Sequence, residues 1–136
     1  MEIRPIADGY AVAPQIEPGD MPAVADAGFV LVICNRPDAE NPPERSMARM
    51  AEAAKGAGLR FEAVPVTHDT LAGEAGRQRA LIDGAGGPVL AYCASGTRST
   101  VLWALGQVGN RPADEIVEAG ARAGYDLSGL RGALGG

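Results

Sequence analysis

The chain has 136 residues and a formal net charge of −5, and a length in this range predicts one compact domain spanning residues 1–136. The acidic balance argues against a nucleic-acid partner, because neutralising many phosphates needs clustered Lys and Arg side chains. It does not exclude a small anion bound at one local site. The longest apolar run, 28–34, is too short to span a bilayer, and the first ten residues lack the apolar core of a signal peptide. We therefore expect no membrane partner and a cytoplasmic location.

Metal-binding and disulfide patterns are sparse. The sequence has one histidine, His68, and two cysteines, Cys34 and Cys93, with no CxxC or HxxxH spacing. We expect no metal and no other cofactor. A Cys34–Cys93 disulfide is conceivable, but free thiols are expected in a reducing compartment.

Short apolar runs alternate with helical stretches, which predicts an α/β fold with a central sheet of four or five mostly parallel strands flanked by helices. The runs at 29–34 and 88–92 are apolar throughout, as in strands covered on both faces. Gly73 and Gly76 each weaken the predicted helix at 71–83 by about 1 kcal/mol relative to alanine. The predicted strands are 3–6, 10–13, 29–34, 59–66 and 88–92. The first predicted helix is short, with Asp20 as its N-cap and its end by residue 28. The other predicted helices are 44–57, 71–83, 99–108, 112–123 and 127–134.

The segment after the strand at 88–92 carries the clearest chemical signal. The strand delivers Cys93 to the carboxyl edge of the sheet, where ligands bind in open α/β folds. A helix then begins, and its first N–H groups and positive dipole end favour anions. Gly96 permits a backbone angle that a β-carbon would penalise. The predicted anion-binding loop consists of Ala94, Ser95, Gly96, Thr97 and Arg98.

The same dipoles are expected to stabilise a thiolate at Cys93. Arg98 offers a planar guanidinium suited to two oxygens of an oxyanion. Ser99 is expected to donate a hydrogen bond to the Cys93 sulfur and to temper it as a leaving group. The alternative is a buried, inert cysteine with Arg98 in a surface salt bridge. That alternative gives no reason for the presence of Gly96 and Arg98 in this loop.

Two more polar side chains follow the strand at 29–34. Arg36 and Asp38 are expected at the same sheet edge as Cys93. Arg36 would help bind an anion, or Asp38 would orient the loop; alternatively, Asp38 simply braces a turn. Cys34 is interpreted as a core cysteine, with a resolving thiol for oxidised Cys93 as the other reading.

The ensemble of motifs resembles a known family, over residues 12–130. The family is the bacterial beta-lactamase hydrolase-like, phosphatase-like domain, found alone or fused to metallo-β-lactamase-like hydrolases. The resemblance implies a dual-specificity-phosphatase-like fold, with Cys93 as nucleophile and the loop as oxyanion site. The matching segments are 13–16, 28–29 leading to 35–38, 65–67, 92–99 with 102–105, and 123–126.

The loop departs from protein tyrosine and dual-specificity phosphatases, which resemble Cys-x5-Arg. Four residues separate Cys93 from Arg98, which is similar to single-domain rhodanese sulfurtransferases. Phosphatases also need a general acid, for which Asp69 is the candidate, with His68 beside it. The alternatives are that Asp69, or Thr70 in its place, caps the helix at 71–83 and that His68 is a surface residue.

The leading hypothesis is a phosphatase-fold enzyme in which Cys93 attacks a sulfane sulfur, forms a persulfide and passes the sulfur on. Hydrolysis of a phosphomonoester through a phosphocysteine, with Asp69 as acid, is the rival. A third reading is a redox or anion sensor whose Cys93 is modified without turnover. The expected partner is a small anionic or sulfane-sulfur substrate.

Overall fold

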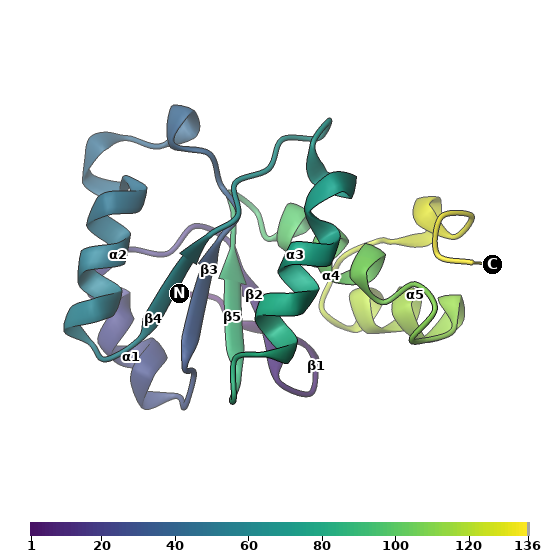
Figure 1. Ribbon diagram of the computed structural model, residues 1–136, viewed down its shortest axis with the longest axis horizontal. Helices are drawn as coiled ribbons and strands as arrows, with labels where there is room; N and C mark the ends of the chain where they lie inside the picture. The colour runs from purple at the N-terminus through teal and green to yellow at the C-terminus, as the bar shows by residue number, and fades with distance from the viewer. Residues whose placement is uncertain (136) are drawn as a thin grey trace.

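The computed structural model describes residues 1–135 and confirms the mostly parallel α/β sheet (Figure 1). Its five strands lie in the order β1-β2-β5-β3-β4. β1 pairs antiparallel with β2, and the other neighbours are parallel. The strands are β1 (Arg4–Ala7), β2 (Tyr10–Ala13), β3 (Leu31–Cys34), β4 (Arg60–Ala63) and β5 (Val89–Tyr92).

Helices cover both faces of the sheet (Figure 1). Met21 of α1 and Met50 of α2 are buried in the cluster on one face. Trp103 of α4 and Ile116 of α5 are buried in the cluster on the other, and α3 packs beside α4. Because both faces are covered, β3 and β5 are buried along their whole length, as their continuous apolar sequences predicted. The helices are α1 (Met21–Asp26), α2 (Met47–Gly56), α3 (Leu71–Asp83), α4 (Thr97–Gly106) and α5 (Ala113–Arg122).

Several predicted boundaries were wrong for local reasons. The predicted strand at 59–66 is only Arg60–Ala63. The predicted helix at 44–57 is a 3-10 turn, Pro43–Arg45, followed by α2, because Ser46 is extended and its hydroxyl accepts from the Arg49 N–H at 3.3 Å.

Asp20 is the N-cap residue of α1, as predicted, but its side chain makes no capping hydrogen bond. Its carboxylate instead accepts from the Glu17 N–H at 2.8 Å and closes a 3-10 turn, Pro18–Asp20. At the other end of the chain, the predicted helix at 127–134 is a 3-10 turn, Ser128–Leu130, followed by further turns.

The sheet order sets where the site lies. β5 lies between β2 and β3, and all three run parallel, so the loops that follow them meet at one edge. The loop after β5 is central, and α4 begins at its end, two residues earlier than predicted. The residue before α4 is Gly96, with φ of +90°. This left-handed conformation turns the chain, so the helix begins at the next residue, Thr97.

Two helical glycines should respond in opposite ways to alanine. At Gly76 in α3, an added β-carbon meets nothing within 4 Å, so Gly76→Ala should stabilise the protein by up to about 1 kcal/mol. At Gly120 in α5, it would lie 2.5 Å from Leu127 Cδ1, so Gly120→Ala should destabilise by about 1–3 kcal/mol. Urea unfolding of both variants measures the difference, and equal midpoints would contradict this packing.

Candidate active site

Cys93 follows β5 directly and is fully buried, at 0% exposure. The Gly96 N–H donates to its sulfur, with N and Sγ 3.1 Å apart. Ala94, Ser95 and Thr97 are exposed around them. The positive φ predicted for Gly96 is confirmed. The loop therefore turns around the sulfur and directs at least one backbone donor at it.

Helix α4 adds further donors. Its internal hydrogen bonding begins with Thr100 N–H to Gly96 O at 3.0 Å, so the preceding N–H groups lack helical acceptors. The Ser95 hydroxyl accepts from the Thr97 N–H at 3.3 Å. The N–H groups of Arg98 and Ser99 remain at the head of the helix, where the helix dipole is positive. This end of α4 suits a negative charge.

The Arg98 side chain is held from one side. Nη1 donates to Glu40 Oε2 and to the Val66 carbonyl, both at 2.9 Å, and Nη2 donates to Glu40 Oε1 at 2.8 Å. A guanidinium has five N–H donors, so the Nε–H and one Nη2–H remain. These two lie on one edge of the plane, at the spacing of two oxyanion oxygens.

Glu40 was missed by the sequence analysis, because nothing in the sequence brings residue 40 to residue 98. Hydrogen bonding to Arg98 holds the pKa of the Glu40 carboxyl below its ordinary value. The same bond raises the pKa of Arg98, against the opposing effect of burial, and the charge of Cys93 raises it further.

Arg36 and Asp38 lie in the same loop as Glu40. Arg36 donates from Nη1 to Gln15 Oε1 at 3.1 Å and from Nη2 to the Glu40 carbonyl at 2.9 Å. Asp38 accepts from the Met47 N–H at 2.8 Å, which braces the turn into α2. Both side chains therefore fix the loop that carries Glu40, and anion binding by Arg36 stays a prediction.

The expected role of Ser99 was wrong. Its hydroxyl donates to Asn35 Oδ1 at 2.8 Å, so its one proton is not directed at Cys93. Asn35 and Gln78 exchange two further hydrogen bonds, and Tyr10 donates to the Ser99 carbonyl at 2.7 Å. The sequence analysis included Asn35 only in the segment 35–38 that carries the family resemblance, and it gave no sign of this buried network.

His68 and Asp69 lie in the exposed turn before α3. The N-cap of α3 is Thr70, so the interpretation of Asp69 as the cap was wrong. The turn is closed instead by the Thr70 hydroxyl, which accepts from the Thr67 N–H at 2.9 Å. Within residues 1–135 no hydrogen bond fixes the Asp69 carboxylate, and its role as an acid stays a prediction.

The two cysteines are separate free thiols. Cys34 ends β3, packs in the cluster beneath α1 and α2, and donates to the Arg36 carbonyl at 3.4 Å. Burial raises the pKa of Cys34, so this thiol resists ionisation. These features fit a core cysteine, and a resolving role stays a hypothesis.

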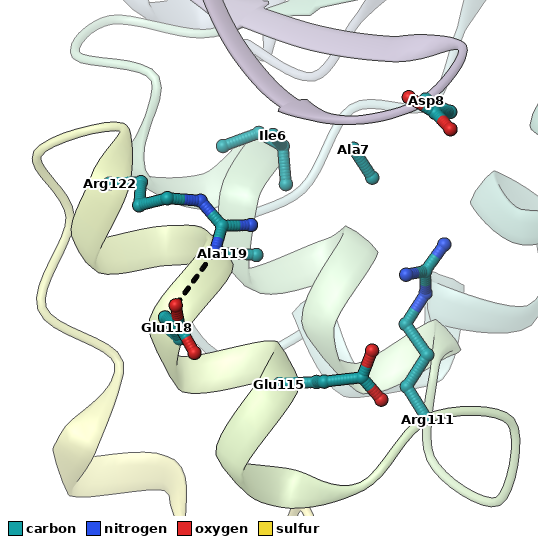
Figure 2. A pocket seen from close by; sticks show the side chains of 8 residues that line it. All are labelled: Ile6, Ala7, Asp8, Arg111, Glu115, Glu118, Ala119 and Arg122. Carbon is teal, nitrogen blue, oxygen red and sulfur yellow. Dashed lines mark hydrogen bonds and ion pairs between the residues drawn. The ribbon is translucent and has the colours of Figure 1, made fainter.

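A separate cavity of about 390 Å³ lies between β1 and α5 (Figure 2). None of its lining residues belongs to the anion-binding loop. The lining residues are Ile6, Ala7, Asp8, Arg111, Glu115, Glu118, Ala119 and Arg122.

Within residues 1–135, no group of three or more His, Cys, Asp or Glu side chains could hold a metal ion. No helix in that range has the length and hydrophobicity needed to cross a membrane.

The lowered pKa of Glu40 gives a pH prediction. A carboxyl whose pKa is lower in the folded state contributes stability above its unfolded pKa, and loses it as the pH falls through the folded value. At neutral pH the wild type should therefore be more stable than Glu40→Gln, by a small margin since Glu40 is exposed. The margin should vanish in acid. Urea unfolding across pH measures it; a margin unchanged in acid would contradict the ion pair.

Solved structures with this fold include phosphatases. A phosphatase candidate from Neisseria meningitidis Z2491 aligns with a TM-score of 0.86 at 33% identity, covering 99% of this chain and 97% of that one. Pseudomonas aeruginosa TpbA, solved in complex with pTyr, aligns with a TM-score of 0.61 at 16% identity, covering 94% and 86%. Kinase associated phosphatase aligns with a TM-score of 0.71 at 9% identity, covering 99% of this chain and 92% of that one. The predicted dual-specificity-phosphatase-like fold is thereby confirmed.

Proteins with similar sequences point to one family. A beta-lactamase hydrolase-like protein of Agrobacterium fabrum is 32% identical over 126 residues, and one of Xylella fastidiosa is 35% identical over 131. These alignments cover 90% and 93% of this chain but only 29% and 30% of the relatives, so the chain spans under a third of their length. Residues 2–110 match the family model for the beta-lactamase hydrolase-like protein, phosphatase-like domain. The chain therefore belongs to this phosphatase-like domain family.

Proposed function

We propose that this domain catalyses a covalent group transfer in which the Cys93 thiolate is the nucleophile. The observation that carries the proposal is the Gly96 N–H directed at the Cys93 sulfur, beside Arg98, whose Nε–H and second Nη2–H make no hydrogen bond within residues 1–135. Backbone donors stabilise the attacking thiolate and the departing anion at no reorganisation cost. Arg98 would hold two oxygens of the donor while the sulfur attacks.

The favoured reaction is sulfur transfer. The Cys93 thiolate attacks the outer sulfur of a donor such as thiosulfate, a new S–S bond forms, and the old one breaks as sulfite leaves with the electron pair. The product is a persulfide on Cys93. An acceptor thiolate or cyanide then attacks the terminal sulfur, and the Cys93 thiolate is released.

Two features favour sulfur over phosphorus. Only four residues separate Cys93 from Arg98, so the loop is one N–H shorter than in Cys-x5-Arg phosphatases and suits a small group. Sulfur transfer also needs no proton donor, because sulfite and thiolates leave as anions. The one candidate acid, Asp69, lies in an exposed turn.

Phosphomonoester hydrolysis is the second candidate, favoured by the family and by the phosphatases that share the fold. Here the Cys93 sulfur attacks phosphorus, and the ester oxygen leaves with a proton from Asp69. Water then releases phosphate from the phosphocysteine and restores the thiol. Substrates of either class would be small anions, which suits a domain with one local anion site.

Thiosulfate separates these candidates. After incubation with thiosulfate, intact-protein mass spectrometry of the wild type should show the gain of one sulfur atom, which cyanide then removes as thiocyanate. Cys93→Ser should gain none. Cys34→Ser should behave as the wild type, because the Cys34 thiol donates to the Arg36 carbonyl and burial raises its pKa. A wild type that gains no sulfur would exclude sulfur transfer.

Aryl phosphate tests the second candidate. If phosphate is released, Asp69→Asn should slow the release by about 10²–10⁴-fold, the usual contribution of a general acid. His68→Asn, in the same turn, is the matched control and should keep the wild-type rate. Reversible oxidation of Cys93 with neither product formed would instead support a sensor.

A further inference from the structure

The Ser95–Gly96 peptide makes two hydrogen bonds in opposite directions. Its N–H points inward to the Cys93 sulfur at 3.1 Å, and its carbonyl points outward and accepts from the Tyr125 hydroxyl at 3.0 Å. The C=O and N–H of a trans peptide are antiparallel, so fixing one fixes the other. Tyr125 therefore bonds the outer end of the one peptide whose inner end touches the sulfur.

That peptide needs an external constraint. Gly96 has φ of +90° and, lacking a β-carbon, tolerates either sign of φ about equally. Rotation of the peptide plane would turn the Ser95 carbonyl toward the sulfur and replace a donor with an acceptor. A carbonyl there would repel both a thiolate and an oxyanion.

Tyr125 is itself firmly placed. It is 8% exposed, and its N–H donates to the Gly120 carbonyl at 2.8 Å, which anchors it to the end of α5. The Arg4 guanidinium lies 5.3 Å from the ring centroid and donates to the Ala123 carbonyl at 3.2 Å. Burial raises the pKa of Tyr125, which keeps the phenol a donor. Its oxygen lies 2.1 Å from where a β-carbon on Gly96 would stand, so only glycine admits it.

We propose that Tyr125 is a positioning residue that holds the Ser95–Gly96 peptide with its N–H toward Cys93 and so keeps the anion site formed. The proposal deepens the group-transfer function proposed above and rests on it for its kinetic consequence. Its structural consequence, the orientation of one peptide, is measurable without any substrate.

Tyr125→Phe keeps the ring and removes only the hydroxyl. Amide hydrogen exchange of Gly96, measured by NMR, should become about tenfold faster, as expected for the loss of one hydrogen bond that supports a closed conformation. kcat/KM for sulfur transfer from thiosulfate should fall by about the same factor. The fold should persist, with unfolding cooperative as in the wild type.

Tyr92→Phe is the matched control, because Tyr92 adjoins Cys93 but its buried hydroxyl bonds no atom of the loop. It should leave both Gly96 exchange and the transfer rate unchanged. Unchanged Gly96 exchange in Tyr125→Phe would overturn the proposal, even if the rate fell. Faster exchange in a protein whose wild type transfers neither sulfur nor phosphate would support the positioning role and refute the proposed function.

Discussion

The hydrogen bond from the Gly96 N–H to the Cys93 sulfur is the interaction on which the rest of this site depends. Cys93 follows β5 directly, and α4 begins four residues after Cys93. The Gly96 N–H, in the loop between them, donates to the sulfur. Once the loop is held in one conformation, its backbone dipoles form a preorganised environment for negative charge. Every other feature of the site either supplies charge to this loop or holds it in shape.

A positive and a negative side chain pair beside the loop. Arg98 brings a positive charge to the loop, and Glu40 neutralises part of it while orienting the guanidinium. Arg36 in turn donates a hydrogen bond to the backbone carbonyl of Glu40 and so holds the loop that carries Glu40. The anion binding proposed for this site would depend on directed donors more than on net charge, which is consistent with a chain whose overall charge is −5.

The loop is held in shape from two sides. Beneath it, Asn35, Gln78, Tyr10 and Ser99 form a buried hydrogen-bond network that joins β2, β3, α3 and α4. Above it, Tyr125 reaches the Ser95 carbonyl from the C-terminal segment. Buried polar groups that satisfy one another specify one arrangement, because breaking any bond leaves a partner unsatisfied. The site is therefore built by several segments of the chain, of which the sequence analysis recognised only the loop after β5 as a motif.

The sequence by itself determined the α/β class, the burial of β3 and β5 along their whole length, and the loop with Cys93, Gly96 and Arg98. These follow from local properties: runs of apolar residues, the spacing of helix and strand, and a glycine where φ is positive. It placed helix ends less well, because the extended conformation of Ser46 delays the start of α2, and α4 begins two residues before the predicted start.

Only the tertiary structure decided which side chains meet. Glu40 reaches Arg98 across 58 residues, Asn35 takes the Ser99 hydroxyl across 64, and Tyr125 reaches Ser95 across 30. A single polar residue in a loop carries no periodicity, so its partner is fixed by the strand order and by the packing of helices on the sheet. For the same reason the sequence assigned Ser99 to the nearest sulfur, whereas the fold assigned it to the end of a neighbouring strand.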